Sequence, residues 1–381
     1  MPNMQLLYCA TDKEIFDVLM SSKQHFSEEA MLNLARARGL ILSPEDGRSG
    51  LADSLSAMIF GFEDVRALEA EFDRAGRGEK TTFFRLNTAL TTAEIKAIAD
   101  EYRDGSDADR VATYMLGTSG VAVDVKYTET DFSKTRLRQR QTKEARIEFK
   151  IEDGHTVVTL PATEKARSVA QHLRERLRAK REAELAYEEV DLSAVQDLRL
   201  RTQFFTRLIS SLAGLQLHNV TRVKVDTAED RLDPSDDEAG GEEADEMQEA
   251  SAQMLGVVKA VALHGESLLS SLEYQNLSSK GFFITSITWS AKRTESPFQI
   301  VQFDAGFDDP SLGQGFKYAV RGWSTQRNGN YSKSFRPMLP EDKKVFLAVI
   351  ERTAITVFRE LRSDAQTPSS DEAVGADRES A

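Results

Sequence analysis

A run of cations and aromatic side chains between residues 315 and 337 has the composition that holds single-stranded nucleic acid. Bases stack on aromatic faces, at about 1–3 kcal/mol each, while lysine and arginine side chains follow the phosphate backbone. No acidic residue interrupts the sequence between Asp309 and Glu341. The candidate contact residues are Lys317, Arg321, Trp323, Arg327, Tyr331 and Lys333. The alternative is a strand with one core face and one solvated face, in which Phe316 and Tyr318 are core residues.

A second concentration of positive charge lies between Lys134 and Lys150, where seven lysine and arginine residues outnumber Glu144 and Glu148. The arginines and lysines of an expected helix at 163–184 could join it in one basic surface that attracts a polyanion. A charged surface exposed to solvent is the simpler alternative. The candidate phosphate contacts in this run are Lys134, Arg136, Arg138 and Arg140.

Within the same run, Glu148-Phe149-Lys150 lies on an expected strand downstream of Asp124 and Asp131. With either aspartate, this motif resembles the metal-binding core of restriction-type nucleases. The resemblance implies that an aspartate and Glu148 would hold magnesium while Lys150 polarises a water molecule. A magnesium-dependent nuclease, with Asp131, Glu148 and Lys150 as its candidate residues, is therefore one alternative function.

A helical hairpin is predicted between Ser27 and Met58, where Ser27 caps the first helix and Gly39 ends it. The arrangement resembles the SAP-type helix-extended-loop-helix DNA-binding module over about 32 residues. The resemblance implies a core of Leu34, Leu40, Leu51 and Leu55, with phosphate contacts from Arg36, Arg38 and Arg48. The loop is slightly longer than in that family and contains Glu45 and Asp46. A hairpin that only packs is the alternative.

Other catalytic and metal-binding patterns are incomplete. The sequence 76–81 has glutamate where a phosphate loop needs the glycine before its lysine. The sequence 117–120 lacks the second glycine at the spacing that a nucleophile elbow uses. Five scattered histidines and the single Cys9 exclude an internal disulfide and provide no zinc-site spacing. We therefore expect no cofactor and no metal ion.

The net charge of −13 is concentrated in two acidic segments. Residues 226–249 carry −11 and residues 363–381 carry −4, so the rest of the chain has a net charge of +2. Both segments are poor in apolar residues, and burial cannot offset the entropy of ordering them. We expect a disordered linker and a disordered tail. The linker is either a solvating spacer or a decoy that competes with nucleic acid for the basic surfaces.

The periodicity of apolar residues predicts an α+β multidomain fold with mainly antiparallel strands. Residues 11–117 have a helical pattern, whereas alternation between Val121 and Pro161 predicts strands joined by a tight turn at Asp153-Gly154. The expected divisions are a helical N-terminal domain with the SAP-like hairpin (1–118), a basic α+β domain (119–225), the acidic linker (226–250), a C-terminal α+β domain (251–362) and the tail (363–381).

These features favour a nucleic-acid-binding accessory protein of bacterial type without catalytic activity of its own. Its expected partner is DNA or RNA, and protein partners are an option. A scaffold or adaptor subunit of a multi-protein system is the main alternative, ahead of the nuclease. The sequence has no run of 18 apolar residues and no signal-peptide pattern, so we expect a cytoplasmic protein that does not enter the membrane.

Overall fold

The computed structural model describes the chain except for residues 1–9, 22, 24, 74–78, 107–108, 118–119, 153, 183, 228–240, 265–271, 328–329, 333 and 367–381. Within its helices and strands, the described side chains exclude those of 69–73, 138, 241–245, 261–264, 326–327, 330 and 365–366. The chain divides into two compact units. Unit 1 comprises Met1–Glu79, Ala93–Leu116 and Val121–Arg146, and unit 2 comprises Lys80–Thr92, Gly117–Gly120 and Ile147–Ala381.

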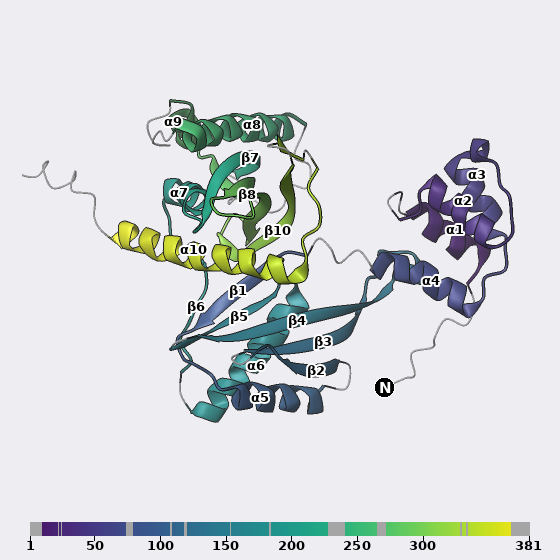
Figure 1. Cartoon of the computed structure of the whole chain (residues 1–381), viewed down its shortest axis with the longest axis horizontal. Helices are drawn as coiled ribbons and strands as arrows, with labels where there is room; N and C mark the ends of the chain where they lie inside the picture. Colours follow the sequence, from purple (N-terminus) through teal and green to yellow (C-terminus); the bar gives the residue numbers. More distant parts are fainter. Residues whose placement is uncertain are drawn as a thin grey trace, which may run out of the picture. The chain divides into compact units, whose positions relative to one another are not determined.

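Unit 1 begins with short helices (Figure 1). Their bounds are α1 (Asp12–Ser21), α2 (Glu28–Ala37), α3 (Gly47–Ser56) and α4 (Phe62–Asp73), with a 3₁₀ turn at Pro44–Asp46. Thr11 and Glu14 form a reciprocal cap of α1, and the Ser27 hydroxyl accepts from the Ala30 amide at the start of α2. Leu19, Met31 and Leu51 are fully buried where the first three helices meet.

Two strands interrupt the region for which an all-helical domain was expected. They are β1 (Thr81–Leu86), in unit 2, and β2 (Arg110–Met115), which pairs with β3 (Gly120–Thr130) and follows helix α5 (Thr92–Asp104). The expectation of helix across 11–117 was therefore wrong at these positions. The residues explain it, because β-branched and aromatic side chains, as in Thr81-Thr-Phe-Phe84, favour strand over helix.

Strand β4 (Arg140–Glu152) follows β3 in unit 1 and continues into unit 2, where it pairs with β5 (His155–Pro161). The tight turn between β4 and β5 is confirmed, since Glu152 pairs with His155 and Gly154 has a φ of +78°. Asp153 lies outside the described residues. In unit 2 the sheet runs β4-β5-β1-β10-β9-β8-β7, and neighbouring strands of this order pair antiparallel.

The remaining elements of unit 2 combine helices and strands. They are α6 (Glu164–Arg181), β6 (Tyr187–Glu188), α7 (Leu198–Ser210), β7 (Leu215–Asp226), α8 (Gly241–His264), α9 (Leu272–Ser279), β8 (Phe283–Arg293), β9 (Gln299–Asp309), β10 (Gln314–Arg327), β11 (Asn330–Tyr331) and α10 (Pro340–Gln366). The fold is thus α+β with an antiparallel sheet, as expected. Helix α8 starts at Gly241, inside the stretch expected to be a linker, because Ala250 and Met254 are buried in the core. Residues 228–240 and 367–381, where the linker and tail were expected, lie outside the described residues.

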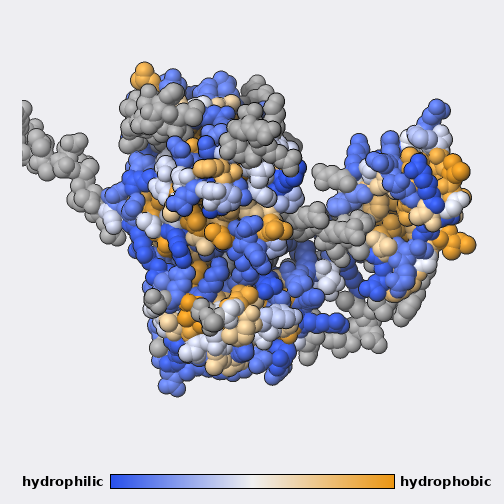
Figure 2. Space-filling view, in the orientation of Figure 1, coloured by the Kyte–Doolittle hydropathy of each residue, from blue (hydrophilic) through white to orange (hydrophobic). Residues whose placement is uncertain are grey.

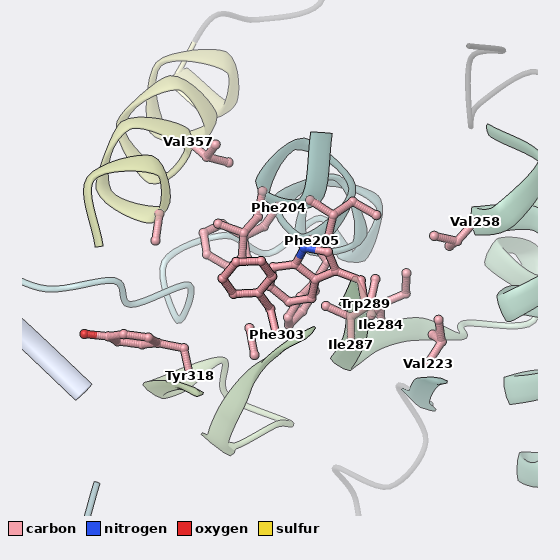
Figure 3. Packing of buried hydrophobic residues seen from close by; sticks show 14 of the residues in the cluster. Phe204, Phe205, Val223, Val258, Ile284, Ile287, Trp289, Phe303, Tyr318 and Val357 are labelled. Carbon is pink, nitrogen blue, oxygen red and sulfur yellow. The ribbon is translucent and has the colours of Figure 1, made fainter. Parts of the chain in front are cut away.

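Helices cover one face of the C-terminal strands of unit 2 (Figure 1). Helix α8 packs on β7, α7 on β7 and β8, and α10 on α7 and β10. Between them lies an aromatic core in which Phe204, Phe205, Trp289 and Phe303 are fully buried (Figure 3). In the described part of the chain, every helix is too short or too polar for the hydrocarbon core of a bilayer.

One buried polar contact joins α10 to the sheet. The Tyr318 hydroxyl of β10 points away from the neighbouring rings (Figure 3) and donates to Glu351 of α10 at 2.5 Å. The Thr159 hydroxyl of β5 donates to the same carboxylate oxygen at 3.2 Å. Burial, and then the charge of Glu351, raises the pKa of Tyr318 well above its ordinary value. Tyr318 therefore stays protonated as a structural donor.

Candidate functional site

Strands β7–β10 carry charged side chains on the face opposite the helices. In β9, Val301 and Phe303 belong to the aromatic core, whereas Asp304 points to the other side because successive side chains of a strand alternate. The register places Asp304 between Thr288 of β8 and Ala319 of β10. We call this side of the sheet the polar face. Its described charged side chains are the cations of Lys80, Arg222, Lys224, Lys292, Lys317 and Arg321 and the carboxylates of Asp304 and Asp308.

Asp304 is the centre of this face. Its side chain is only 7% exposed and forms ion pairs with Lys80, next to β1, and with Arg321 of β10 at 2.9 Å. The Thr288 hydroxyl donates to the same carboxylate at 3.0 Å. Burial opposes ionisation, but Lys80 and then Arg321 hold the pKa of Asp304 below its ordinary value. The carboxylate is therefore ionised and holds both cations at the surface of the sheet.

Asp308 has the same relation to two other cations. It forms ion pairs with Lys317 of β10 at 2.6 Å and with Arg167 near the start of α6. Each carboxylate of the polar face is thus shared by two cations, which leaves a positive charge at each cluster. Arg167, Lys317 and Lys80 are between 22% and 33% exposed, so their charged groups are reachable but recessed.

Strands β7 and β8 add three more cations. Arg222 and Lys224 are exposed on the edge strand β7, opposite Thr288 and Ser286 of β8. No carboxylate partner is found for either within the described part of the chain. Lys292 of β8 lies 5.5 Å from the centre of the Tyr331 ring, which is partly exposed. The face therefore combines an excess of cations with one aromatic ring, a chemistry that suits a polyanion containing planar bases.

Among the predicted C-terminal contacts that the structure describes, Lys317, Arg321 and Tyr331 lie on this face and Trp323 does not. Phe316 and Tyr318 are buried in the core, as the alternative of a half-buried strand predicted. Trp323 packs partly buried against the same core and donates to the Pro337 carbonyl at 3.3 Å. The side chain of Arg327 and the whole of Lys333 lie outside the description.

Two of the three arginines that were predicted to contact phosphates in the SAP-like hairpin instead form contacts within the protein. Arg48 donates to the carbonyls of Phe26, of Leu19 at 2.7 Å and of Met20 at 3.3 Å. Arg38 forms an ion pair with Asp64 at 2.9 Å and lies 4.0 Å from the centre of the Phe60 ring. Arg36 is exposed and donates to the nearby Asn33 side chain at 3.1 Å. Of the expected core, Leu51 and Leu55 are fully buried and Leu34 partly, while Leu40 is 37% exposed.

Apolar side chains are exposed on the same helical region (Figure 2). Ile41 and Ile59 are 96% and 93% exposed, and Phe62 is 47% exposed. Arg38 connects their segments, because it lies three residues before Ile41 and donates to the Ile59 carbonyl at 2.9 Å. Large apolar side chains that are exposed close together are typical of surfaces that contact other proteins.

Several residues of the basic run and of the nuclease candidates form ion pairs within the protein. Lys134 forms an ion pair with Asp131 at 3.0 Å, and the Ser133 side chain, followed by Lys134, lowers the pKa of Asp131 to about 2. Glu148 is buried and pairs with Lys344 of α10 at 2.8 Å. Within the described residues, no group of three or more His, Cys, Asp or Glu side chains could hold a metal ion. Of the other run members, Arg136 pairs with Glu14 at 2.9 Å, Arg140 is exposed, Lys150 is partly exposed, and the side chain of Arg138 is not described.

Sequence reasoning missed the polar face as a unit. Arg222 and Lys224 alternate with Val223 and Val225, which is a readable strand signal, but nothing local connects them to Lys80, some 140 residues earlier. Pairing across the sheet brings them together. Searches of protein-family models and of curated proteins each found no match to this chain.

Proposed function

We propose that the protein is a nucleic-acid-binding accessory protein and that the polar face of unit 2 contacts the phosphate backbone. The observation that carries this proposal is the sharing of each carboxylate, Asp304 and Asp308, by two cations. A face whose own carboxylates leave cations in excess attracts phosphates and releases counterions when it binds them.

The architecture of the face supports binding in preference to catalysis. Backbone binding requires cations that are fixed in position, and Asp304 fixes Lys80 and Arg321 through ion pairs. A nucleophile or general base would need a titratable group with a proton to exchange near neutral pH. Because the cations hold the pKa of Asp304 low, that carboxylate supplies charge and orientation only. We therefore assign no reaction to this face.

The test compares two double variants that lose the same charge. Arg222→Ala with Lys224→Ala removes two exposed cations from the polar face, and Arg352→Ala with Arg362→Ala removes two exposed cations from α10, which covers the opposite face. We expect the first to bind a mixed-sequence oligonucleotide more weakly and the second to bind like the parent. The logarithmic salt slope should fall by about 0.7–0.9 per lost phosphate contact. Equal binding by both variants and the parent would contradict the proposal.

A scaffold function is the second candidate, and the exposed Ile41 and Ile59 favour it. Substituting both by serine should abolish capture of a protein partner while leaving binding of nucleic acid unchanged. The measurement is co-purification from cells of the natural source, followed by the oligonucleotide assay on the same samples. If the nucleic-acid assay is negative and a partner is lost with these substitutions, the scaffold function takes precedence.

A further inference from the structure

The centre of the polar face has a floor of small side chains. Ser286, Gly306 and Lys317 are aligned across β8, β9 and β10, and Ala319 is aligned with Asp304 in the next row. The fit at Gly306 is tight, because a Cβ atom there would lie 3.0 Å from the Ser286 Cβ. Asp304, Gly306 and Ala319 are buried, so a ligand on this face would contact the longer side chains around them.

Long cationic side chains border this floor on both sides. Arg222 and Lys224 stand on β7, while Lys317 and Arg321 stand on β10. Neighbouring strands lie about 4.8 Å apart, so the three intervals from β7 to β10 span roughly 14 Å. Arg167 reaches Asp308 from α6, which places the start of that helix beside the β10 border. The two rows of cations thus border a strip of the sheet that is roughly 14 Å wide.

From this geometry we infer that the polar face binds single-stranded nucleic acid in preference to duplex. The inference rests on the proposed function and names its substrate class. Lys80 and Lys317 are only 22% and 28% exposed, and each is ion-paired with a carboxylate of the face. A flexible single strand can adapt its backbone to cations that are partly covered in this way. A duplex is a stiff, convex cylinder that reaches mainly the most exposed cations, and it therefore forms fewer contacts.

Tyr331 supplies the stacking surface that a single strand uses and a duplex does not. Its partly exposed ring lies 5.5 Å from the Lys292 ammonium, measured to the ring centre. Lys292 belongs to the polar face, since it is aligned with Ile300 opposite the core residues of β8. An aromatic ring beside a cation lets one nucleotide place its base and its phosphate at the same point. Bases inside a duplex are already stacked and cannot use this ring.

The test uses the full-length protein, a fluorescent oligothymidylate and a blunt duplex of equal length as competitor, compared at equal phosphate concentration. We expect the unlabelled single strand to compete at least about tenfold better than the duplex. Tyr331→Ala should weaken single-strand binding by about 5- to 150-fold and leave duplex binding unchanged, whereas Tyr331→Phe should bind like the parent. Melting curves identify any variant that has lost its fold. Tyr331→Phe is the folded variant with which the binding of Tyr331→Ala and of Lys292→Ala is compared.

The outcomes separate this inference from the proposed function. If the Arg222/Lys224 variant loses binding but duplex competes as well as single strand, the proposed function stands and the inference fails. If no oligonucleotide binds, or if that variant binds like the parent, the proposed function itself fails. Polyglutamate of equal charge is the third competitor. If it displaces the oligothymidylate as effectively as the single strand does, the face recognises acidic protein and the inference is overturned.

Discussion

Replacing Asp304 by asparagine should weaken the fold and strengthen binding of nucleic acid at the same time. Asparagine has the same shape and keeps an oxygen that can accept from the Thr288 hydroxyl, but it removes the charge that holds Lys80 and Arg321. The two cations would then be available to phosphates. Because the two effects have opposite signs, a variant that merely unfolds cannot imitate the predicted result.

The loss of stability can be worked out from the exposure of the partners. The Lys80 pair is largely buried, with side chains 22% and 7% exposed, so its charge-assisted contact contributes about 1.5–3 kcal/mol. The Arg321 side chain is 51% exposed, and that pair contributes about 0–1 kcal/mol. We expect a total loss of about 2–4 kcal/mol. For a unit of this size, the melting temperature should fall by roughly 4–15 °C.

The protein provides its own probe for this measurement. Its only tryptophans, Trp289 and Trp323, both lie in unit 2, so urea unfolding followed by tryptophan fluorescence reports on the unit that contains Asp304. Asp308→Asn is the matched control, because Asp308 is 38% exposed and its loss removes the same charge at a cost of at most about 1 kcal/mol. Unchanged stability of Asp304→Asn, or weaker binding of oligonucleotide by a folded variant, would refute the reasoning.

The pH dependence of the same pair has a defined sign. The pKa of Asp304 is lowered in the folded state, so its stabilising effect is fully present above the ordinary aspartate pKa and is lost as the pH falls through the lowered value. The difference in stability between the parent and Asp304→Asn should therefore stay constant between about pH 5 and 8 and shrink below about pH 4. A difference that disappears near neutral pH would show that another group is responsible.

Three further predictions concern other parts of the chain. Arg48→Ala should lower the free energy of unfolding of the helical region by about 2–4 kcal/mol, because it leaves buried carbonyls without a donor. Arg36→Ala should change that free energy, measured from melting curves, by less than about 0.5 kcal/mol. Gly306→Ala should cost about 1–3 kcal/mol in urea unfolding, since its Cβ would crowd Ser286, and a fully stable variant would show that the floor can relax. The parent should not nick plasmid DNA with magnesium, and cleavage that is lost in Glu148→Gln would establish the nuclease hypothesis.

Local signals predicted several strands and helices well. The alternation in β3, β4 and β5, the tight turn at Gly154 and the helix that follows Thr163 all depend on residues within a few positions of one another. The region 11–117 was predicted less well. There the helical pattern was extended across β1, a strand of unit 2 whose partners lie at positions 156–161 and 318.

The candidate site could be predicted only in part, for a physical reason. Lys317 and Arg321 were identified because their strand alternates cations with aromatic residues. Asp304 and Lys80 were not identified, because the ion pair between them depends on the alignment of strands that lie more than 200 residues apart in the sequence. Arg48 shows the converse case. The sequence predicts a phosphate contact from its charge, whereas in the structure its guanidinium donates to backbone carbonyls that the sequence does not identify as unpaired.

The position of β1 between β5 and β10 also determines when the sheet can be completed during synthesis. The β1 segment leaves the ribosome early, but its β10 partner is made more than 200 residues later. Until then the Thr81 end of β1 has no neighbour on that edge, because β6 pairs only with Arg85 and Leu86, and such an open edge is a template for association with other chains. A messenger truncated before residue 314 should thus yield an insoluble fragment, and the full chain should depend on chaperones that hold nascent strands apart.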